Sequence, residues 1–251
     1  MSTMDLQLLA LLLVIVTLLV WRAATRERRE YAQFKRMRST VARQKVMRKW
    51  LTESVLVMGG LSVAVLLAAW EYVPTALRDA QQWAPIAASR DFFATSVGTG
   101  LAIGALIGGL AALILPLIFA RNATPDDIPK LGDIGALLPR TRGELPYGAG
   151  LAVSAGVFEE LLFRLAMPAL LFGIWPNGPV AFLLATVLFG CLHLYQKWTG
   201  VIAATVLGLI FAYLYLVSGS ILLPIIVHML IDIRSLVLLP LVVGKVWSKR
   251  V

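Results

Sequence analysis

The sequence predicts an all-α fold, a polytopic bundle of about seven transmembrane helices with the N-terminus outside and the C-terminus in the cytoplasm. Three observations lead to this prediction. The 251 residues are 59% hydrophobic and only 15% charged, and their mean hydropathy is +0.82. The apolar residues gather in stretches long enough to cross a bilayer. The net charge of +9 gathers beside the first stretch, which favours a cytoplasmic loop near anionic lipid over a nucleic-acid-binding surface.

Residues 1–120 are predicted to form an N-terminal part with a basic cytoplasmic segment. Its spans are Leu6–Trp21, Leu51–Trp70 and Phe92–Ala120. Asp5 stands where a signal peptide carries basic residues, and no small-residue cleavage site follows, so the first span is expected to remain as an anchor. Residues 22–49 contain eleven lysines and arginines and two glutamates, and the positive-inside rule places this segment in the cytoplasm.

The third predicted span carries a repeat of small residues. Gly100, Gly104 and Gly108 recur at every fourth position, which predicts close packing of this helix against another. The preceding segment, Glu71–Asp91, is polar and lacks a positive excess, so we expect it to be a loop on the outer side.

Residues 121–251 are predicted to form the functional core. Its spans are Tyr147–Phe172, Val180–Leu194, Gly200–Val217 and Ile221–Val243. The polar loop Arg121–Pro146 and the charges Lys245, Lys249 and Arg250 are expected in the cytoplasm. The single cysteine, Cys191, excludes an internal disulfide and is predicted to be a small core residue.

Ionisable side chains are few in these last spans, and they are the best indicator of function. They are Glu159, Glu160, Arg164, His193, His228, Asp232 and Arg234, and they include both histidines of the chain. Each ionisable group at membrane depth costs about 2.5–3.5 kcal/mol on insertion scales. Singly, a histidine or a Glu–Arg pair here is as often structural as functional, and Arg234 is expected to be structural. Their concentration predicts a polar site within the membrane.

Helix geometry predicts how these groups meet. Glu160 and Arg164 are four residues apart and can pair, as can His228 and Asp232. Glu159 is rotated by about 100° from Glu160, so it is free to face a cavity. With a rise of about 1.5 Å per residue, Glu159 and His228 lie roughly 18 Å from the inner side and His193 roughly 9 Å from it. Within the error of the span boundaries, these groups share one layer.

A buried carboxylate beside a histidine can act as a general base, so Glu159 with His193 can activate water while His228 donates to an oxyanion. No serine lies in a nucleophile-elbow context, and Cys191 lies on a different helix face from His193, which favours direct water attack over an acyl-enzyme. Alternatively, these carboxylates and histidines could hold a catalytic zinc ion.

Three motifs resemble those of a known family. They are EE-x3-R at 159–164, F-x3-H from Phe189 to His193, and H-x3-D from His228 to Asp232. In this order and spacing they resemble the CAAX protease and bacteriocin-processing (CPBP, or Abi) family of intramembrane endopeptidases, over about Glu144–Leu239. The resemblance implies a membrane protease that cuts near the C-terminus of a prenylated or other membrane-associated protein.

The resemblance also implies roles for the motif residues. Glu159 and His193 activate water, His228 and position 232 form the oxyanion hole, and Glu160, Arg164 and Phe189 support the site. The CAAX prenyl endopeptidases have Asn at the last position, whereas some bacterial members have Asp, as here. An ionised Asp232 cannot donate to an oxyanion, so it is expected to orient His228, to be protonated or to bind a metal. We expect a metal-free glutamate enzyme, with zinc held by Glu159, His193 and His228 as the alternative.

Two other functions remain open at this stage. A non-catalytic interaction or immunity protein could retain the pocket, and a small transporter could use Glu159 and His193 as a proton relay. The expected partners are membrane lipid and a protein or peptide substrate at the membrane, with no nucleic acid. The expected location is a bacterial cytoplasmic membrane. The sequence predicts neither the substrate nor the oligomeric state.

Overall fold

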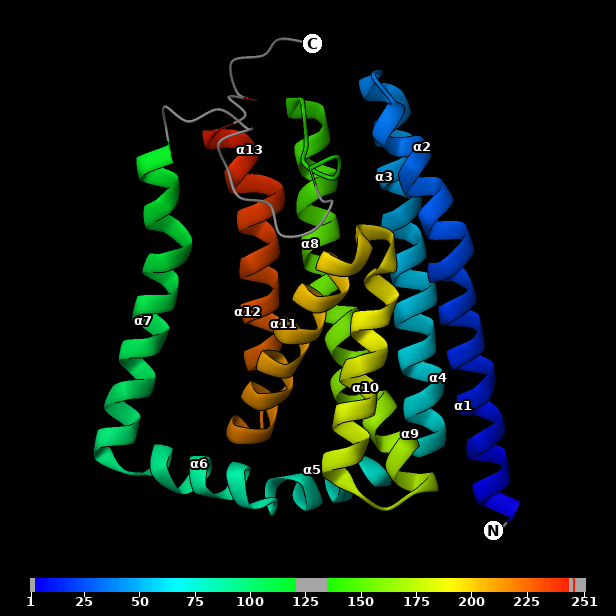
Figure 1. Ribbon diagram of the computed structural model, residues 1–251, viewed down its shortest axis with the longest axis vertical. Coiled ribbons are helices and arrows are strands. Elements are labelled where there is room, and N and C mark those ends of the chain that lie inside the picture. Colours follow the sequence, from blue (N-terminus) through cyan, green and yellow to red (C-terminus); the bar gives the residue numbers. More distant parts are fainter. Residues whose placement is uncertain (1–2, 121–134, 244–245, 247–251) are drawn as a thin grey trace.

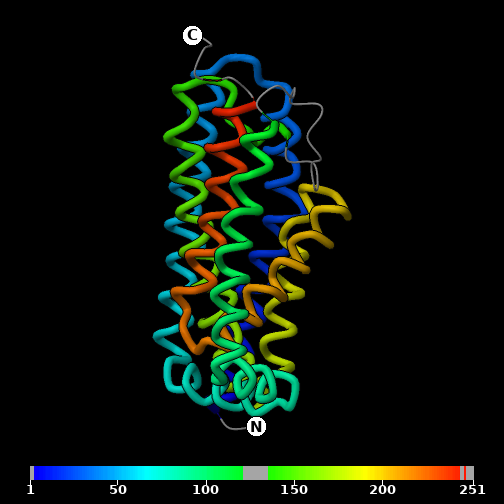
Figure 2. Tube along the Cα trace, turned by 90° about the vertical axis from the view of Figure 1, so that its left-hand side faces the viewer, coloured from blue at the N-terminus to red at the C-terminus, as the bar shows by residue number. Residues whose placement is uncertain are grey.

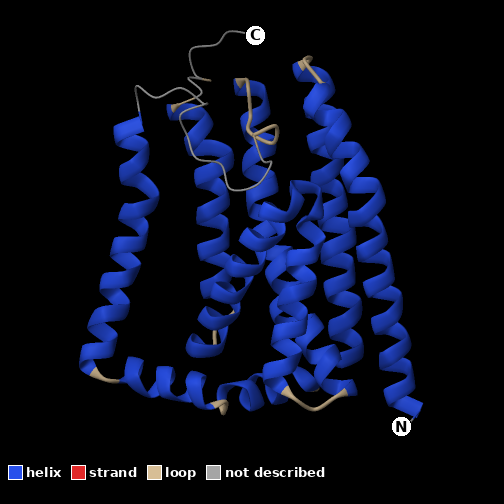
Figure 3. Cartoon of the chain, viewed as in Figure 1, coloured by secondary structure: helices blue, strands red, loops and turns tan. Residues whose placement is uncertain are grey.

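The computed structural model describes residues 3–120, 135–243 and 246, and these residues form helices and no strands (Figures 1 and 3). The predicted all-α membrane bundle is confirmed. Among the described residues, 5 helices are long and apolar enough to cross a membrane. They are Thr3–Arg36, Thr40–Ala69, Ser96–Phe119, Gly178–Ser218 and Leu222–Val242. The charges predicted at Lys245, Lys249 and Arg250, and most of the loop before residue 135, lie outside the described residues.

Two long antiparallel helices form the N-terminal part (Figure 1, blue and cyan). The first comprises α1 (Thr3–Trp21), the π-helical turn η1 (Arg22–Glu27) and α2 (Arg28–Arg36); the second comprises α3 (Thr40–Glu53), the π-helical turn η2 (Ser54–Gly59) and α4 (Gly60–Ala69). Ser39 caps the second helix, because its Oγ accepts from the Ala42 amide at 3.4 Å. The basic segment is therefore helical, and it forms the ends of both helices that point away from the N-terminus.

The segment Glu71–Asp91, predicted as a polar connection on the outer side, is helical, and its outer placement stays a prediction. α5 (Tyr72–Gln81) and α6 (Ala84–Ala94) lie across one end of the bundle (Figure 1). Pro74 and Pro85 fall in the first turns of these helices, where a missing amide hydrogen costs nothing. Arg90 of α6 donates to the carbonyls of Leu216 and Val217 at 3.2 and 2.9 Å and so caps a neighbouring helix end.

Asp79 of α5 caps the helix that carries His193. Its Oδ2 accepts from the Gly178 amide at 2.6 Å, at a helix start where Asn177 also accepts from Val180. Replacing Asp79 with alanine is expected to lower the unfolding free energy by about 1 kcal/mol, which thermal unfolding in detergent can measure. Asp91→Ala, at an exposed acid of α6, is the matched control. Equal melting temperatures for the two variants would contradict the capping role.

α7 (Ser96–Phe119) begins later than the predicted span, because Thr95 starts a new helix. Thr95 Oγ1 accepts from the Gly98 amide at 3.0 Å, and Phe92 and Phe93 belong to α6. The predicted packing of Gly100, Gly104 and Gly108 is wrong within the described chain. A Cβ at any of these glycines would meet nothing within 4 Å.

The remaining helices form the core (Figures 1 and 2). They are α8 (Leu145–Glu160) with η5 (Leu161–Ala166) and α9 (Met167–Ile174), α10 (Gly178–Leu192) with the 3-10 turn η6 (His193–Gln196), α11 (Lys197–Ser218), and α12 (Leu222–Ile233) with η7 (Arg234–Leu238) and α13 (Leu239–Val242). The apolar run 178–218 reverses at Lys197, whose φ is 67°. The tip of this hairpin ends below the ends of α2 and α3 in both views.

The N-terminal helices pack directly on the core. Leu8, Ile15 and Leu19 of α1 share one hydrophobic cluster with Phe163 and Leu170. The proposed division at residue 120 stays a prediction, because this packing does not test it. Cys191 is exposed, so its prediction as a core residue is wrong. The apolar residues next to Cys191 in the sequence do not indicate which face of α10 it occupies.

Candidate active site

Glu160 is the centre of the candidate site. Its Oε1 accepts a hydrogen bond from His228 Nδ1 at 2.8 Å, and its Oε2 lies 3.1 Å from Arg164 Nε. Glu160 and Arg164 are both fully buried, so each charge depends on its partner. The predicted pairing of Glu160 with Arg164 is therefore present. The bond from Glu160 to His228 was not predicted, and it joins the first motif to the third.

Arg164 is held by aromatic rings and by a backbone carbonyl. Its guanidinium carbon lies 4.7 Å from the ring centre of Phe189 and 5.4 Å from that of Phe211. Its Nη2 donates to the Gly208 carbonyl at 3.1 Å. A Cβ at Gly208 would approach Arg164 Nη2 to 3.3 Å and Phe189 to 3.0 Å. Glycine at 208 thus lets the arginine reach the backbone of α11.

His228 is oriented by three neighbours. Its ring stacks on Phe211 with centroids 4.7 Å apart and an interplanar angle of 18°. Because the Glu160 carboxylate accepts from Nδ1, this nitrogen carries a hydrogen. Nε2 lies 3.6 Å from Asp232 Oδ2, which is too long for a hydrogen bond but allows an electrostatic contact. His228 and Asp232 therefore lie together as predicted, and their contact is electrostatic.

His193 lies at the end of α10, where the helix tightens into η6. Its Nδ1 is 2.9 Å from the Phe189 carbonyl. A carbonyl only accepts, so Nδ1 carries the hydrogen and Nε2 of the neutral ring keeps its lone pair. Phe189 also contacts this ring at 4.8 Å and the His228 ring at 6.4 Å. Phe189 therefore links the second motif to both histidines and to Arg164.

Glu159 is partly exposed and interacts electrostatically with His228 and Asp232. Among the described residues it makes no hydrogen bond to His193, although this pair was expected to act together. His193 is joined to His228 through Phe189, whose ring contacts both imidazoles. The structure thus brings the ionisable residues of all three motifs into one cluster and leaves Glu159 without a direct polar partner there.

A comparison of the sequence with known protein families finds a match over the segment that carries this cluster. Residues 141–234 match the family model described as type II CAAX prenyl endopeptidase Rce1-like. The chain contains an Rce1-like domain. The match includes all three motifs and confirms the resemblance to the CPBP family. Together with the apolar helices, it indicates an integral membrane protein that is similar, over this segment, to CAAX-type intramembrane proteases. Searches of curated proteins and of solved structures found no match.

Arg234, at the end of the Rce1-like domain, lies apart from this cluster. Its Nε donates to the Leu113 carbonyl at 3.0 Å and joins η7 to α7. Its role as a structural or lumenal charge without chemistry stays a prediction. Leu117 of α7 packs nearby against Leu239 and Val243.

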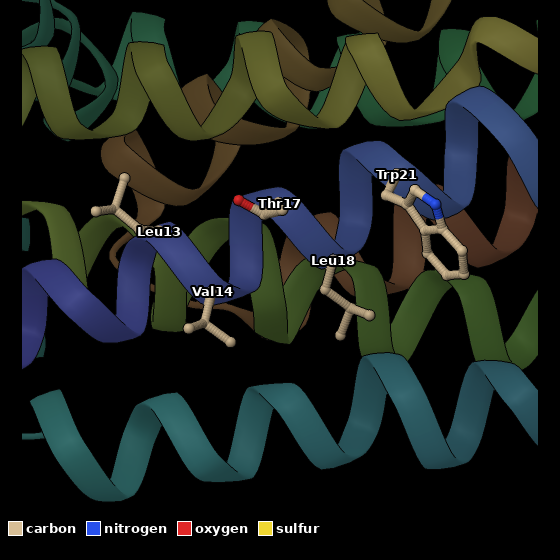
Figure 4. Close-up of a pocket in the computed structure, with 5 residues that line it drawn as sticks. All are labelled: Leu13, Val14, Thr17, Leu18 and Trp21. Carbon is tan, nitrogen blue, oxygen red and sulfur yellow. The ribbon is translucent and has the colours of Figure 1, made fainter.

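The zinc alternative requires Glu159, His193 and His228 to converge on one point. Across residues 3–120 and 135–243, no three His, Cys, Asp or Glu side chains are arranged to hold a metal ion. Both the metal-free enzyme and the zinc alternative stay predictions. A groove on the surface of α1 is unsuited to catalysis, because its lining is apolar apart from Thr17 (Figure 4). Its lining residues are Leu13, Val14, Thr17, Leu18 and Trp21.

Three site residues were missed from the sequence. Gly208 and Phe211 contact Arg164 and His228, and Tyr195 stacks on His193 with ring centres 6.0 Å apart. A signal for the first two was available, since the buried residues of α11 recur at intervals of three and four. They include Ala204, Gly208, Phe211 and Tyr215. This inward face would have pointed to Phe211.

Proposed function

We propose that this protein is an intramembrane endopeptidase that hydrolyses a peptide bond near the C-terminus of a membrane-associated, CAAX-like prenylated protein. The observation that carries the proposal is that Glu160, Arg164 and His228 contact one another, and that the ring of Phe189 joins Arg164 and His228 to His193. One imidazole in this cluster has a free Nε2 lone pair, on His193. A polar cluster of this kind inside an apolar bundle is costly without a function.

In the proposed reaction, Glu159 and His193 remove a proton from water as its oxygen attacks the scissile carbonyl carbon. The tetrahedral oxyanion is stabilised by the Nε2–H of a protonated His228, whose Nδ1–H is already bound to Glu160. The proton taken from water then passes to the leaving amine nitrogen as the carbon–nitrogen bond breaks. Asp232, near Nε2 of His228, favours the charged imidazole and does not itself donate to the oxyanion.

Glu159→Gln and His193→Ala are each expected to lower cleavage of a prenylated CAAX-type reporter peptide by roughly 10²–10⁴-fold, because each removes a proton-transfer group. The assay uses the full chain in liposomes and follows peptide cleavage by mass spectrometry. Glu71→Gln, at an exposed acid far from the cluster, is the matched control and retains activity. A cellular phenotype that survives both substitutions would instead indicate an interaction or immunity protein, and proton-coupled flux would indicate a transporter.

The proposed mechanism uses no metal, because Glu159 and His193 can activate water by themselves. Prolonged dialysis against a chelator is therefore expected to leave the cleavage rate unchanged. Metal analysis of the dialysed protein checks that removal is complete. Loss of activity on dialysis, with recovery when zinc is added back, would contradict the metal-free mechanism.

The protein is proposed to lie in a bacterial cytoplasmic membrane, where lipid surrounds it. The substrate is proposed to reach the site from that membrane. The basic segment 22–49 supports an orientation in which the ends of α2 and α3 lie in the cytoplasm. The variants Lys45→Cys and Ser218→Cys, each labelled with a thiol reagent from either side of the membrane, test this orientation. Lys45 is expected to label from the cytoplasm and Ser218 from outside.

A further inference from the structure

The turn that carries His193 rests against the N-terminal helices, which lie outside the Rce1-like match. η6 contacts both η1 and α2. The ring of Tyr195 in η6 stacks on His193 with an interplanar angle of 28°. On α2, Tyr31 meets Tyr195 edge to face, with ring centres 5.3 Å apart and an angle of 73°. A chain of aromatic contacts thus runs from the first long helix to a predicted catalytic histidine.

Tyr31 is a firm support for this chain. It is 3% exposed and belongs to a hydrophobic cluster with Phe34, Met47 and Ala136. Phe34 packs on Trp50 at 4.7 Å, which ties α2 to α3. Side chains in such clusters have few accessible rotamers, so the position of Tyr31 is well defined.

His193, in contrast, has few other restraints. The one hydrogen bond of its side chain among the described residues is to the Phe189 carbonyl, and the Phe189 ring contacts the imidazole at 4.8 Å. It also sits where α10 ends, so the helix does not fix its backbone on both sides. The direction of its Nε2 lone pair therefore depends on the Tyr195 ring as well. Tyr195 is itself held on its polar side, since its Oη accepts from Gln196 Nε2 at 2.8 Å.

We propose that Tyr31 and Tyr195 are positioning residues for His193, so that the N-terminal helices complete the active site of the Rce1-like domain. The proposal rests on the proposed protease function for its kinetic consequence. Its structural consequence, a changed environment of the His193 ring, does not depend on that function.

The kinetic test compares Tyr31→Leu and Tyr195→Leu with Phe34→Leu. All remove an aromatic ring near the same cluster, but Phe34 has no recorded ring contact to Tyr195 or His193. The two tyrosine variants are expected to lower kcat by about three- to tenfold with little change in KM, the effect of losing one aromatic contact that orients a catalytic group. Tyr31→Phe keeps the ring and is expected to restore kcat to within about twofold. An equal loss in Phe34→Leu would show a structural effect and overturn the proposal.

The second test needs no activity. The chain contains only 2 histidines, so selective isotope labelling gives one set of ring signals for each in detergent. His193→Gln assigns them. We expect Tyr31→Leu and Tyr195→Leu to shift the His193 signals and leave those of His228 in place, while Phe34→Leu shifts neither. Unshifted His193 signals overturn the positioning role. Shifted signals in a protein that cleaves no peptide would support the positioning and reject the protease.

Discussion

Replacing Glu160 with alanine is expected to destabilise the protein by about 3–5 kcal/mol and to abolish cleavage, because it leaves a buried arginine without its counter-charge. Arg164 is 1% exposed and has no other carboxylate partner recorded among the described residues. His228 also loses the acceptor that holds its Nδ1–H. Thermal unfolding in detergent measures the first effect, and cleavage of the reporter peptide measures the second.

A double substitution separates these two effects. Glu160→Gln with Arg164→Met removes both charges and keeps similar volumes, so we expect most of the lost stability to return. Cleavage is expected to stay low, because a neutral amide does not favour a charged His228 as the carboxylate does. If the double variant regained activity, Glu160 would serve only to neutralise Arg164, and its proposed action on His228 would be refuted.

Arg43→Ala is expected to destabilise the protein to a similar extent, about 3–5 kcal/mol, although Arg43 lies far from the site in sequence. Its Nε donates to Glu144 Oε1 at 2.9 Å, and its Nη2 donates to the Ala136 and Leu138 carbonyls at 3.0 and 3.3 Å. Arg43 and Glu144 are both 0% exposed. The substitution therefore leaves the buried Glu144 carboxylate without its counter-charge, with the Arg140 amide as a remaining donor, and removes the side-chain donor to two carbonyls. Thermal unfolding measures this loss.

Two variants control this result. Arg48→Ala removes an exposed arginine from the same helix and is expected to leave the melting temperature unchanged. Arg43→Lys keeps the charge but cannot span the carboxylate and the carbonyls at once, so it should remain clearly destabilised. A melting temperature for Arg43→Lys equal to that of the parent would mean that charge alone matters here.

The sequence predicted which residues lie together better than it predicted the contacts among them. Hydropathy located the spans, and the cost of charge in a membrane singled out the residues that the structure gathers. The four-residue spacing of Glu160 and Arg164 is enough to predict their pairing. The bond between Glu160 and His228 joins residues 68 positions apart, and helix periodicity within one span cannot reveal it.

The errors have a common physical origin. The glycines of α7 predict a close helix contact, but periodicity does not say whether a partner is present in the same chain. Cys191 has the composition of a core residue around it and still faces outward, because apolar residues in a membrane point to lipid as readily as to protein. The helices α5 and α6 were missed because their polarity resembles that of a loop, although they lie across the end of the bundle.

α7 differs from the other helices in how it is attached, and this has a consequence for the membrane around it. Residues 101–110 are exposed on every side, and α7 contacts α6 at one end and η7 and α13 at the other. Its 24 residues are roughly 36 Å long, which exceeds a hydrocarbon core of about 30 Å. Because residues 101–110 have no packing partner among the described residues, the tilt of α7 between its attached ends can respond to hydrophobic mismatch with the bilayer. Membrane thickness is thus a variable that acts on this helix and leaves the tightly packed site of α8, α10, α11 and α12 in place.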